Sequence, residues 1–184
     1  MLRLIELNTG WVERYRAFVE EFLAAGEGDD LMSLLGEPTL PDLLRRLEGF
    51  ARGENLPRGW VPATTYWLVD AAGTILGELR FRRLLTKGLE DVGGHVGYRV
   101  RPGQRCRGLA TTMLRRAIEE ARRAGLARIL VTCDAENLAS ARVIEKCGGE
   151  LASRSIAHNG RLTSRYWIPL AQDAGRAFPA ARVR

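Results

Sequence analysis

The stretch HVGYRVRPGQRCRGLA, residues 95–110, decides the fold of this chain. It starts with the alternating apolar pattern of a β-strand over residues 96–100, and Pro102-Gly103 ends that strand. The basic loop Arg105–Gly108 then leads into a helical pattern that continues to Ala124. The first turn of a helix has backbone N–H groups without intrahelical partners and carries the positive end of the helix dipole. This strand, loop and helix therefore predict a binding site for a phosphorylated ligand at the start of the helix.

Helical and strand patterns lie on both sides of this stretch. Apolar residues recur every three or four positions where we expect a helix, and they alternate where we expect a strand. Turn residues separate these segments, and the Asn159-Gly160 pair is a strong hairpin signal. The expected elements are strands over residues 2–7, 66–70, 74–83, 128–133, 150–157 and 161–170, and helices over residues 11–25, 40–53, 108–125 and 137–147. Residues 55–65 and 86–94 are expected to be loops, and residues 171–184 a peripheral tail.

The bulk composition is that of a folded globular chain. Its 184 residues suit one domain, with 46% hydrophobic and 27% charged residues. No apolar run is long enough to cross a membrane and no signal-peptide core begins the chain, so we expect a cytoplasmic protein without a membrane partner. We also expect no metal site, because Cys106, Cys133 and Cys147 lack the spacing of metal ligands.

The chain is strongly basic. A formal charge of +6 and a pI of about 9.8 indicate a negatively charged partner, which includes nucleic acid, an anionic surface and a phosphorylated cofactor. Many arginines alternate with glutamates on the expected helices, which is typical of a solvated helix face rather than a continuous basic stripe. This pattern disfavours nucleic acid as the partner.

The basic loop carries the motif of a known family. Arg105-Cys106-Arg107-Gly108-Leu109-Ala110 fits the pattern Arg/Gln-x-x-Gly-x-Gly/Ala, and Val100-Arg101-Pro102 precedes it as Val-x-Pro does in that family. The segment from Asn137 to Gly149 is similar to a later family pattern, in which an Asn follows a strand and the next helix closes at Gly. The chain thus resembles the GNAT superfamily of acyl-CoA-dependent N-acetyltransferases, most strongly over residues 95–151.

The resemblance implies an α/β fold of the α+β type, in which helices flank a mixed, mostly antiparallel sheet with splayed central strands. It implies one N-acetyltransferase domain over residues 1–184, with the cofactor-binding core at about 95–151. Acetyl-CoA is the implied cofactor, with its pyrophosphate at the basic loop and its pantetheine along the preceding strand. The residues expected to bind it are Tyr98, Arg99, Val100, Arg105, Cys106, Arg107, Gly108, Leu109, Ala110, Thr111, Asn137 and Ser140. A simple helix cap is the alternative role for Asn137.

The base that takes a proton from the attacking amine is left open between two residues. Strand alternation puts Glu78 on the face opposite Phe81. Its carboxylate is a candidate base if that face forms a cleft, and a solvated or salt-bridged side chain otherwise. His95 begins the strand at which family members often have a glutamate, and it is the second candidate base or else a surface histidine.

The group that protonates the departing thiolate is open as well. In many relatives it is a tyrosine, which Ile144 replaces in this sequence. Tyr166, the hydroxyl of Ser140 or water would then act, or no acid is needed, because a thiol has a pKa of about 8.5. The same replacement also fits a protein that binds acyl-CoA without fast catalysis.

The expected function is transfer of an acetyl group from acetyl-CoA to a primary amine, by direct attack in a ternary complex. The alternatives are a non-catalytic acyl-CoA-binding or regulatory module and, less favoured, a nucleic-acid-binding protein. Small-molecule and peptide amines both remain open as acceptors, and so does the oligomeric state, a homodimer included. Loop position places Trp60, Thr64, Thr65, Glu37 and Asp42 at the border of the acceptor pocket, and the alternative and commoner role for Trp60 is to close the edge of the core.

Overall fold

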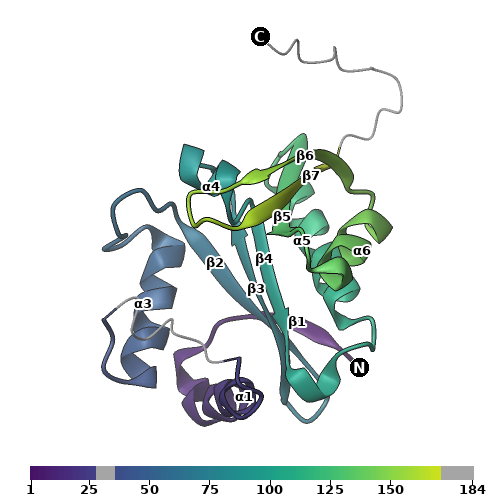
Figure 1. Ribbon diagram of the computed structural model, residues 1–184. Helices are drawn as coiled ribbons and strands as arrows, with labels where there is room; N and C mark the ends of the chain where they lie inside the picture. Colours follow the sequence, from purple (N-terminus) through teal and green to yellow (C-terminus); the bar gives the residue numbers. More distant parts are fainter. Residues whose placement is uncertain (28–35, 171–184) are drawn as a thin grey trace.

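The computed structural model describes residues 1–27 and 36–170, and its helices and strands follow the order expected from the sequence (Figure 1). The elements are β1 (Arg3–Glu6), η1 (Thr9–Trp11), α1 (Val12–Ala24), α3 (Leu40–Arg52), β2 (Ala63–Val69), β3 (Ile75–Arg82), α4 (Lys87–Asp91), β4 (Val96–Val100), η2 (Pro102–Gln104), α5 (Leu109–Arg123), β5 (Arg128–Asp134), α6 (Leu138–Lys146), β6 (Glu150–Ile156) and β7 (Leu162–Pro169). The tail predicted over residues 171–184 lies outside the described residues.

Two expected loops contain regular structure. The loop expected over 86–94 holds the short helix α4, where the Thr86 hydroxyl accepts a hydrogen bond from the Leu89 backbone N–H at 3.4 Å. Five helical residues are too few to show a helical period, so the sequence pattern misses this element. The loop expected over 55–65 ends earlier than predicted, because β2 begins at Ala63. The first residues of β2 pair with the last residues of β3, with Ala63 opposite Arg82.

The strands form two antiparallel sheets that meet at one junction. One sheet has the order β1-β2-β3-β4 and the other has the order β5-β7-β6. At the junction the His95 N–H donates to the Leu130 carbonyl at 2.8 Å, and the Leu130 N–H donates to His95 Nδ1 at 2.9 Å. His95 directly precedes β4, and Leu130 lies near the start of β5. After this contact the two strands continue in different sheets. The predicted α/β class, with mostly antiparallel strands flanked by helices, is confirmed.

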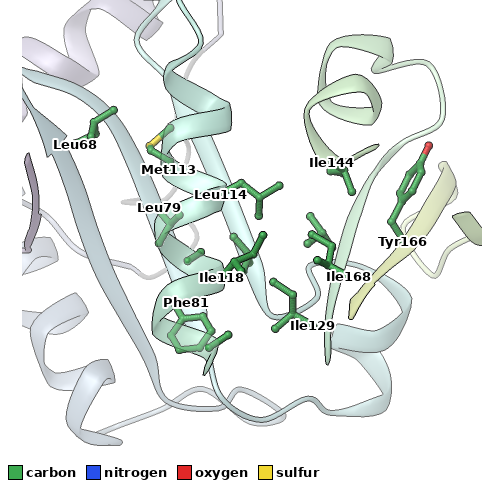
Figure 2. Close-up of a cluster of buried hydrophobic side chains, with 14 of the residues drawn as sticks. Leu68, Leu79, Phe81, Met113, Leu114, Ile118, Ile129, Ile144, Tyr166 and Ile168 are labelled. Carbon is green, nitrogen blue, oxygen red and sulfur yellow. The ribbon is translucent and has the colours of Figure 1, made fainter. Parts of the chain in front are cut away.

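Strand alternation divides the core between the two faces of the first sheet. Leu68 packs in a cluster with α5, whereas its neighbour Trp67 packs with α1 and α3. Figure 2 shows the first cluster, in which Met113 and Ile118 of α5 lie beside β3. The close approach of α5 needs Gly77, because a Cβ at that position would lie 2.7 Å from Met113 Cε. No helix among the described residues is long and apolar enough to span a membrane.

Candidate active site

The basic loop gives the start of α5 the geometry of an anion site. Cys106 and Gly108 have φ values of 60° and 74°, and Gly108 is the N-cap residue of α5. Within the described residues, no side chain caps this helix start. The first backbone N–H of α5 that bonds back to the loop is that of Thr112, which donates to the Gly108 carbonyl at 3.0 Å. The N–H groups before it are therefore available to an anion.

A cavity of about 530 Å³ opens in front of these N–H groups. It lies between the last residues of β4, the loop and first turn of α5, and the first residues of α6. Eleven of the twelve side chains expected to bind the cofactor line it: Tyr98, Arg99, Val100, Arg105, Cys106, Gly108, Leu109, Ala110, Thr111, Asn137 and Ser140. Arg107 is the exception, and its guanidinium donates to Gln104 at 3.0 Å. Sequence reasoning did not select the other lining residues, which are Phe22, Glu27, Gln104, Ala139 and Val143.

Glu27 is the missed residue with the largest electrostatic effect on this cavity. It forms a two-pronged ion pair with Arg105, with N–O distances of 2.7 and 2.5 Å. Hydrogen bonds from Arg105 lower the pKa of the Glu27 carboxyl, and those to Glu27 raise the pKa of the Arg105 guanidinium. A phosphate that binds Arg105 must therefore share or displace this carboxylate.

Tyr98 joins β4 to α6 at the inner end of the cavity. Its hydroxyl lies 2.9 Å from Ser140 Oγ, and either atom can donate. The Asn137 side chain accepts from the Ser140 N–H at 2.9 Å, so Asn137 is a helix cap in addition to lining the cavity. Burial raises the pKa of Tyr98 to about 12, which keeps this hydroxyl protonated. Tyr98 is therefore available as a hydrogen-bond donor inside the cavity.

A second cavity, of about 240 Å³, shares Tyr98 and Arg99 with the first. Its wall contains Glu78, which is 3% exposed and faces away from the α5 side of the sheet, as strand alternation predicts. Glu78 Oε1 lies 3.2 Å from Arg80 and 3.1 Å from Arg99, and the Trp67 indole N–H donates to its other oxygen at 3.3 Å. Burial acts to raise the pKa of the Glu78 carboxyl, but Arg99 and Arg80 outweigh it and lower the pKa. Glu78 is therefore a buried, ionised carboxylate.

Of the other candidate proton-transfer residues, Ser140 lines the first cavity, whereas His95 and Tyr166 lie away from both cavities. His95 is 7% exposed, and its Nδ1 is occupied by the Leu130 N–H, which leaves Nε2 as the protonated nitrogen of the neutral ring. Burial lowers the pKa of His95. Tyr166 is part of the core, with its hydroxyl 3.5 Å from Glu145, and burial raises its pKa. Neither side chain lines the first or second cavity.

A third cavity, of about 510 Å³, brings in one of the residues expected at the acceptor pocket. Trp60 lines it and packs on Phe50 with ring centroids 5.6 Å apart, so it serves both the cavity wall and the core edge. Thr64 and Thr65 lie within β2 and do not line this cavity, and Thr65 is buried. Glu37 pairs with Arg46 at 2.7 Å, and Asp42 lies at the capped start of α3; neither lines the cavity.

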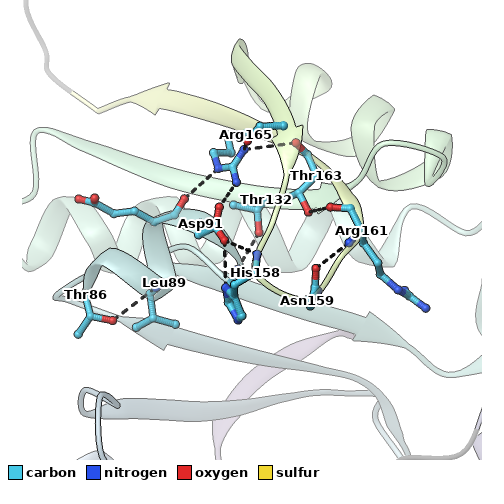
Figure 3. A network of polar contacts seen from close by, with 12 residues as sticks. Thr86, Leu89, Asp91, Thr132, His158, Asn159, Arg161, Thr163 and Arg165 are labelled. Carbon is cyan, nitrogen blue, oxygen red and sulfur yellow. Dashed lines mark hydrogen bonds and ion pairs between the residues drawn. The ribbon is translucent and has the colours of Figure 1, made fainter.

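Polar contacts fix one wall of this third cavity (Figure 3). Asp91 at the end of α4 accepts from the His158 backbone N–H at 2.7 Å, lies 3.0 Å from His158 Nδ1, and pairs with Arg165 of β7. The Gly93 N–H donates to Thr132 of β5 at 2.9 Å. These contacts attach α4 and the segment after it to the second sheet, and so hold His158 against the cavity.

Comparisons with known proteins agree with this architecture. The family model described as acetyltransferase (GNAT) domain matches residues 20–150. No curated protein matches the sequence. The described residues contain no cluster of three or more His, Cys, Asp or Glu side chains that could hold a metal ion.

Several solved structures share the fold. A proposed GNAT-family acetyltransferase from Bordetella pertussis has a TM-score of 0.68 and 20% identity, over 91% of this chain and 94% of that chain. The proposed acetyltransferase yncA from Salmonella typhimurium, solved with its cofactor acetyl-CoA, has a TM-score of 0.62 and 16% identity, over 95% of this chain and 96% of that chain. Mutant forms of the spermidine/spermine N-acetyltransferase SpeG from Vibrio cholerae have a TM-score of 0.59 and 15% identity, over 92% of this chain and 95% of that chain. At these identities the likeness establishes the fold alone.

Proposed function

Because the chain belongs to the GNAT acetyltransferase family, we propose that it transfers the acetyl group of acetyl-CoA to a primary amine while both substrates are bound. The observation that carries this proposal is the meeting of two cavities at Tyr98 and Arg99. The first cavity has the anion-binding geometry of a helix start, and the second has the carboxylate of Glu78 in its wall. An amine in the second cavity would face the acyl end of a cofactor held in the first.

The residues of the first cavity suit coenzyme A. A Cβ built on Gly108 would meet no atom within 4 Å, so the helix start has room for a phosphate group. The N–H groups of the first turn of α5 and the guanidinium of Arg105 supply donors for the pyrophosphate. When bound, acetyl-CoA supplies the activated thioester carbonyl. Tyr98 and the first residues of α6 would line the path of its pantetheine arm.

The direct test is an acceptor screen with the purified chain and acetyl-CoA, with the acetylated amine detected by mass spectrometry. Mass detection is preferable to a thiol reagent because the exposed thiol of Cys106 would react with the reagent itself. Acetylation of at least one amine above the uncatalysed rate supports the proposal. Binding of acetyl-CoA without acetylation of any amine would instead favour the non-catalytic module. The cytoplasmic location and the homodimer considered from the sequence stay predictions.

We propose Glu78 as the group that receives the proton of the attacking ammonium, directly or through a water molecule. Its lowered pKa keeps it ionised throughout the neutral range, so it is ready to accept a proton. Glu78→Gln is expected to lower kcat by about 100-fold or more at every pH in the neutral range, because general-base catalysis contributes that much and the Glu78 carboxylate stays ionised throughout this range. The affinity for acetyl-CoA should stay within about twofold of the wild type, because the substitution leaves the phosphate site intact. Rates measured from pH 6 to about 9 would check this.

His95→Gln is the matched variant for the other candidate base. Since His95 Nδ1 accepts the Leu130 N–H, this variant should lower thermal stability and leave the shape of the pH–rate profile unchanged. A Glu78→Gln enzyme with wild-type kcat would exclude Glu78 as the base, and a His95→Gln enzyme that loses the fall in rate toward low pH would assign the base to His95.

We propose Tyr98 as the hydrogen-bond donor to the departing sulfur, in the role for which relatives use the tyrosine that Ile144 replaces. Its pKa of about 12 lies above that of a thiol, so the phenol stabilises the thiolate by a hydrogen bond instead of protonating it fully. Tyr98→Phe should lower kcat by about 10- to 100-fold, the effect of losing one hydrogen bond to a charged group. Steady-state kinetics against Tyr66→Phe, a half-buried tyrosine on β2 outside these cavities, provides the comparison. Equal kcat values for the two variants would exclude this role.

A further inference from the structure

We propose that the acceptor amine also carries an anionic group, a carboxylate or a phosphate, that binds to Arg82 at the junction of the second and third cavities. The inference rests on the proposed acetyl transfer and narrows its substrate class. It starts from the observation that Arg82 lines both cavities. The two cavities therefore extend the acceptor site from Glu78 toward Trp60 and His158.

The charges that line this extended site are strongly unbalanced. Glu78 is the single carboxylate among the lining residues of the two cavities, and it is already shared between Arg80 and Arg99. His158 has its own acidic neighbour, Asp91, outside the lining. The cationic lining side chains are Arg58, Arg80, Arg82, Lys87 and Arg99. Such a surface attracts an anion and repels a polycation.

Arg82 is the partly buried cation of this lining that has no carboxylate partner among the described residues, whereas Arg80 and Arg99 pair with Glu78. Within residues 1–27 and 36–170 Arg82 forms no ion pair, and its guanidinium donates to the Gly94 carbonyl at 3.4 Å. Burial and the charge of Arg80 lower the pKa of Arg82 to about 10, so it remains charged at neutral pH. An anionic group at the junction of the two cavities would give the Arg82 guanidinium the charged partner that the protein does not supply.

The register of β3 sets the distance between the two ends of the acceptor. Glu78, Arg80 and Arg82 alternate along one face of the strand, at about 3.3 Å per residue. The Cα atoms of Glu78 and Arg82 are thus about 13 Å apart, and the long arginine side chain can shorten the gap. This spacing favours an amine whose anionic group lies several bonds from the nitrogen. Trp60 lies in the third cavity, beyond Arg82 as seen from Glu78, and offers an apolar surface to any part of the acceptor that extends past its anionic group.

The experiment compares matched acceptors under saturating acetyl-CoA. The probes are ω-amino carboxylates from glycine to 6-aminohexanoate, the n-alkylamines and diamines of the same lengths, spermidine, and O-phosphoethanolamine. We expect KM values at least tenfold lower for the longer amino carboxylates than for the matched amines and diamines, because only the former neutralise Arg82. The phosphate probe distinguishes the two anion types. Plain amines, diamines or spermidine with equal or lower KM would overturn the inference while leaving acetyl transfer intact.

Variants of Arg82 separate this inference from the proposed function. Arg82→Gln should raise the KM of the best amino carboxylate at least tenfold without changing acetyl-CoA affinity, whereas Arg83→Gln removes the same charge from an exposed neighbouring residue and should change neither. Arg82→Glu should lower the KM for diamines relative to that for amino carboxylates. Misfolding cannot explain such a result, because it does not improve the use of one acceptor. An Arg82→Gln enzyme that keeps its preference for carboxylates overturns the inference.

If no probe is acetylated, the proposed transfer fails, and the inference is judged by binding. Saturation-transfer NMR with the complex of the chain and coenzyme A should then show stronger binding of 6-aminohexanoate than of hexylamine. Equal binding of the two probes overturns the inference independently of any catalysis.

Discussion

Gly108→Glu is expected to weaken acetyl-CoA binding by at least about 100-fold, which corresponds to about 2.7 kcal/mol. Gly108 begins α5 and lies at the edge of the first cavity, and no atom lies within 4 Å of the place where its Cβ would be. A glutamate side chain therefore fits sterically and projects into the space assigned to the pyrophosphate. Its carboxylate would take up the uncapped N–H groups of the first turn and repel the phosphates.

The fold should survive this change, which makes the loss of binding informative. The residue at position 108 has a φ of 74°, and a side chain there costs about 1–2 kcal/mol of stability. Part of this cost is offset because a carboxylate at a helix start interacts favourably with the helix dipole. Thermal unfolding should thus show a modest loss of stability, and calorimetric titration with acetyl-CoA should show the large loss of affinity.

Gly125→Glu is the control for Gly108→Glu. Gly125 follows α5, has a φ of 76° and likewise has no atom near its Cβ position, so the variant adds the same charge in the same backbone conformation at the other end of the helix. It should bind acetyl-CoA as the wild type does. An unchanged affinity in Gly108→Glu would remove the start of α5 as the phosphate site and with it the basis of the proposed function.

The cavity that we assign to the cofactor was predictable because most of its lining residues are contiguous. A strand, a loop and a helix start that follow one another in sequence must lie close together in space. Most of residues 98–111 therefore line one cavity, and Arg107, which contacts Gln104 instead, does not. Phe22 and Glu27 were missed because they come from the end of the first helix and the residues after it, far away along the sequence. No local pattern shows that Glu27 will meet Arg105, since that contact depends on how α1 packs on the sheet.

The acid–base residues were less predictable because their surroundings are set by strand pairing. Alternation correctly put Glu78 opposite the apolar face of β3, but its contact with Arg99 follows from the β3–β4 register, in which these two residues are partners. The sequence left His95 open as a candidate base or a surface histidine after two glycines. The structure instead uses its ring to accept a backbone N–H of β5, a contact that only the meeting of the two sheets creates.

That meeting of the sheets is the basis of the second large prediction. Gly94→Ala is expected to destabilise the protein by about 3 kcal/mol or more. Gly94 has a φ of 61°, and a Cβ at this position would overlap the Leu130 carbonyl oxygen, with the Leu130 carbonyl carbon at 3.0 Å. The Leu130 oxygen also accepts the His95 N–H, so relief of the overlap would lengthen the hydrogen bond that joins β4 to β5. The cost therefore includes backbone strain, steric overlap and a weakened junction.

Gly148→Ala separates these contributions. Gly148 has a φ of 86° and no atom within 4 Å of its Cβ position, so alanine there carries only the backbone strain of about 1–2 kcal/mol. Urea unfolding of both variants would give the difference as the cost of steric overlap at the junction. The first cavity is lined by β4 and by the start of α6, which follows β5, so a shift of β4 relative to β5 in Gly94→Ala should also weaken acetyl-CoA binding under conditions in which the variant remains folded. Equal stabilities for the two variants would mean that the contact between Gly94 and Leu130 relaxes without a free-energy cost. The junction would then not be what holds β4 in place beside the first cavity.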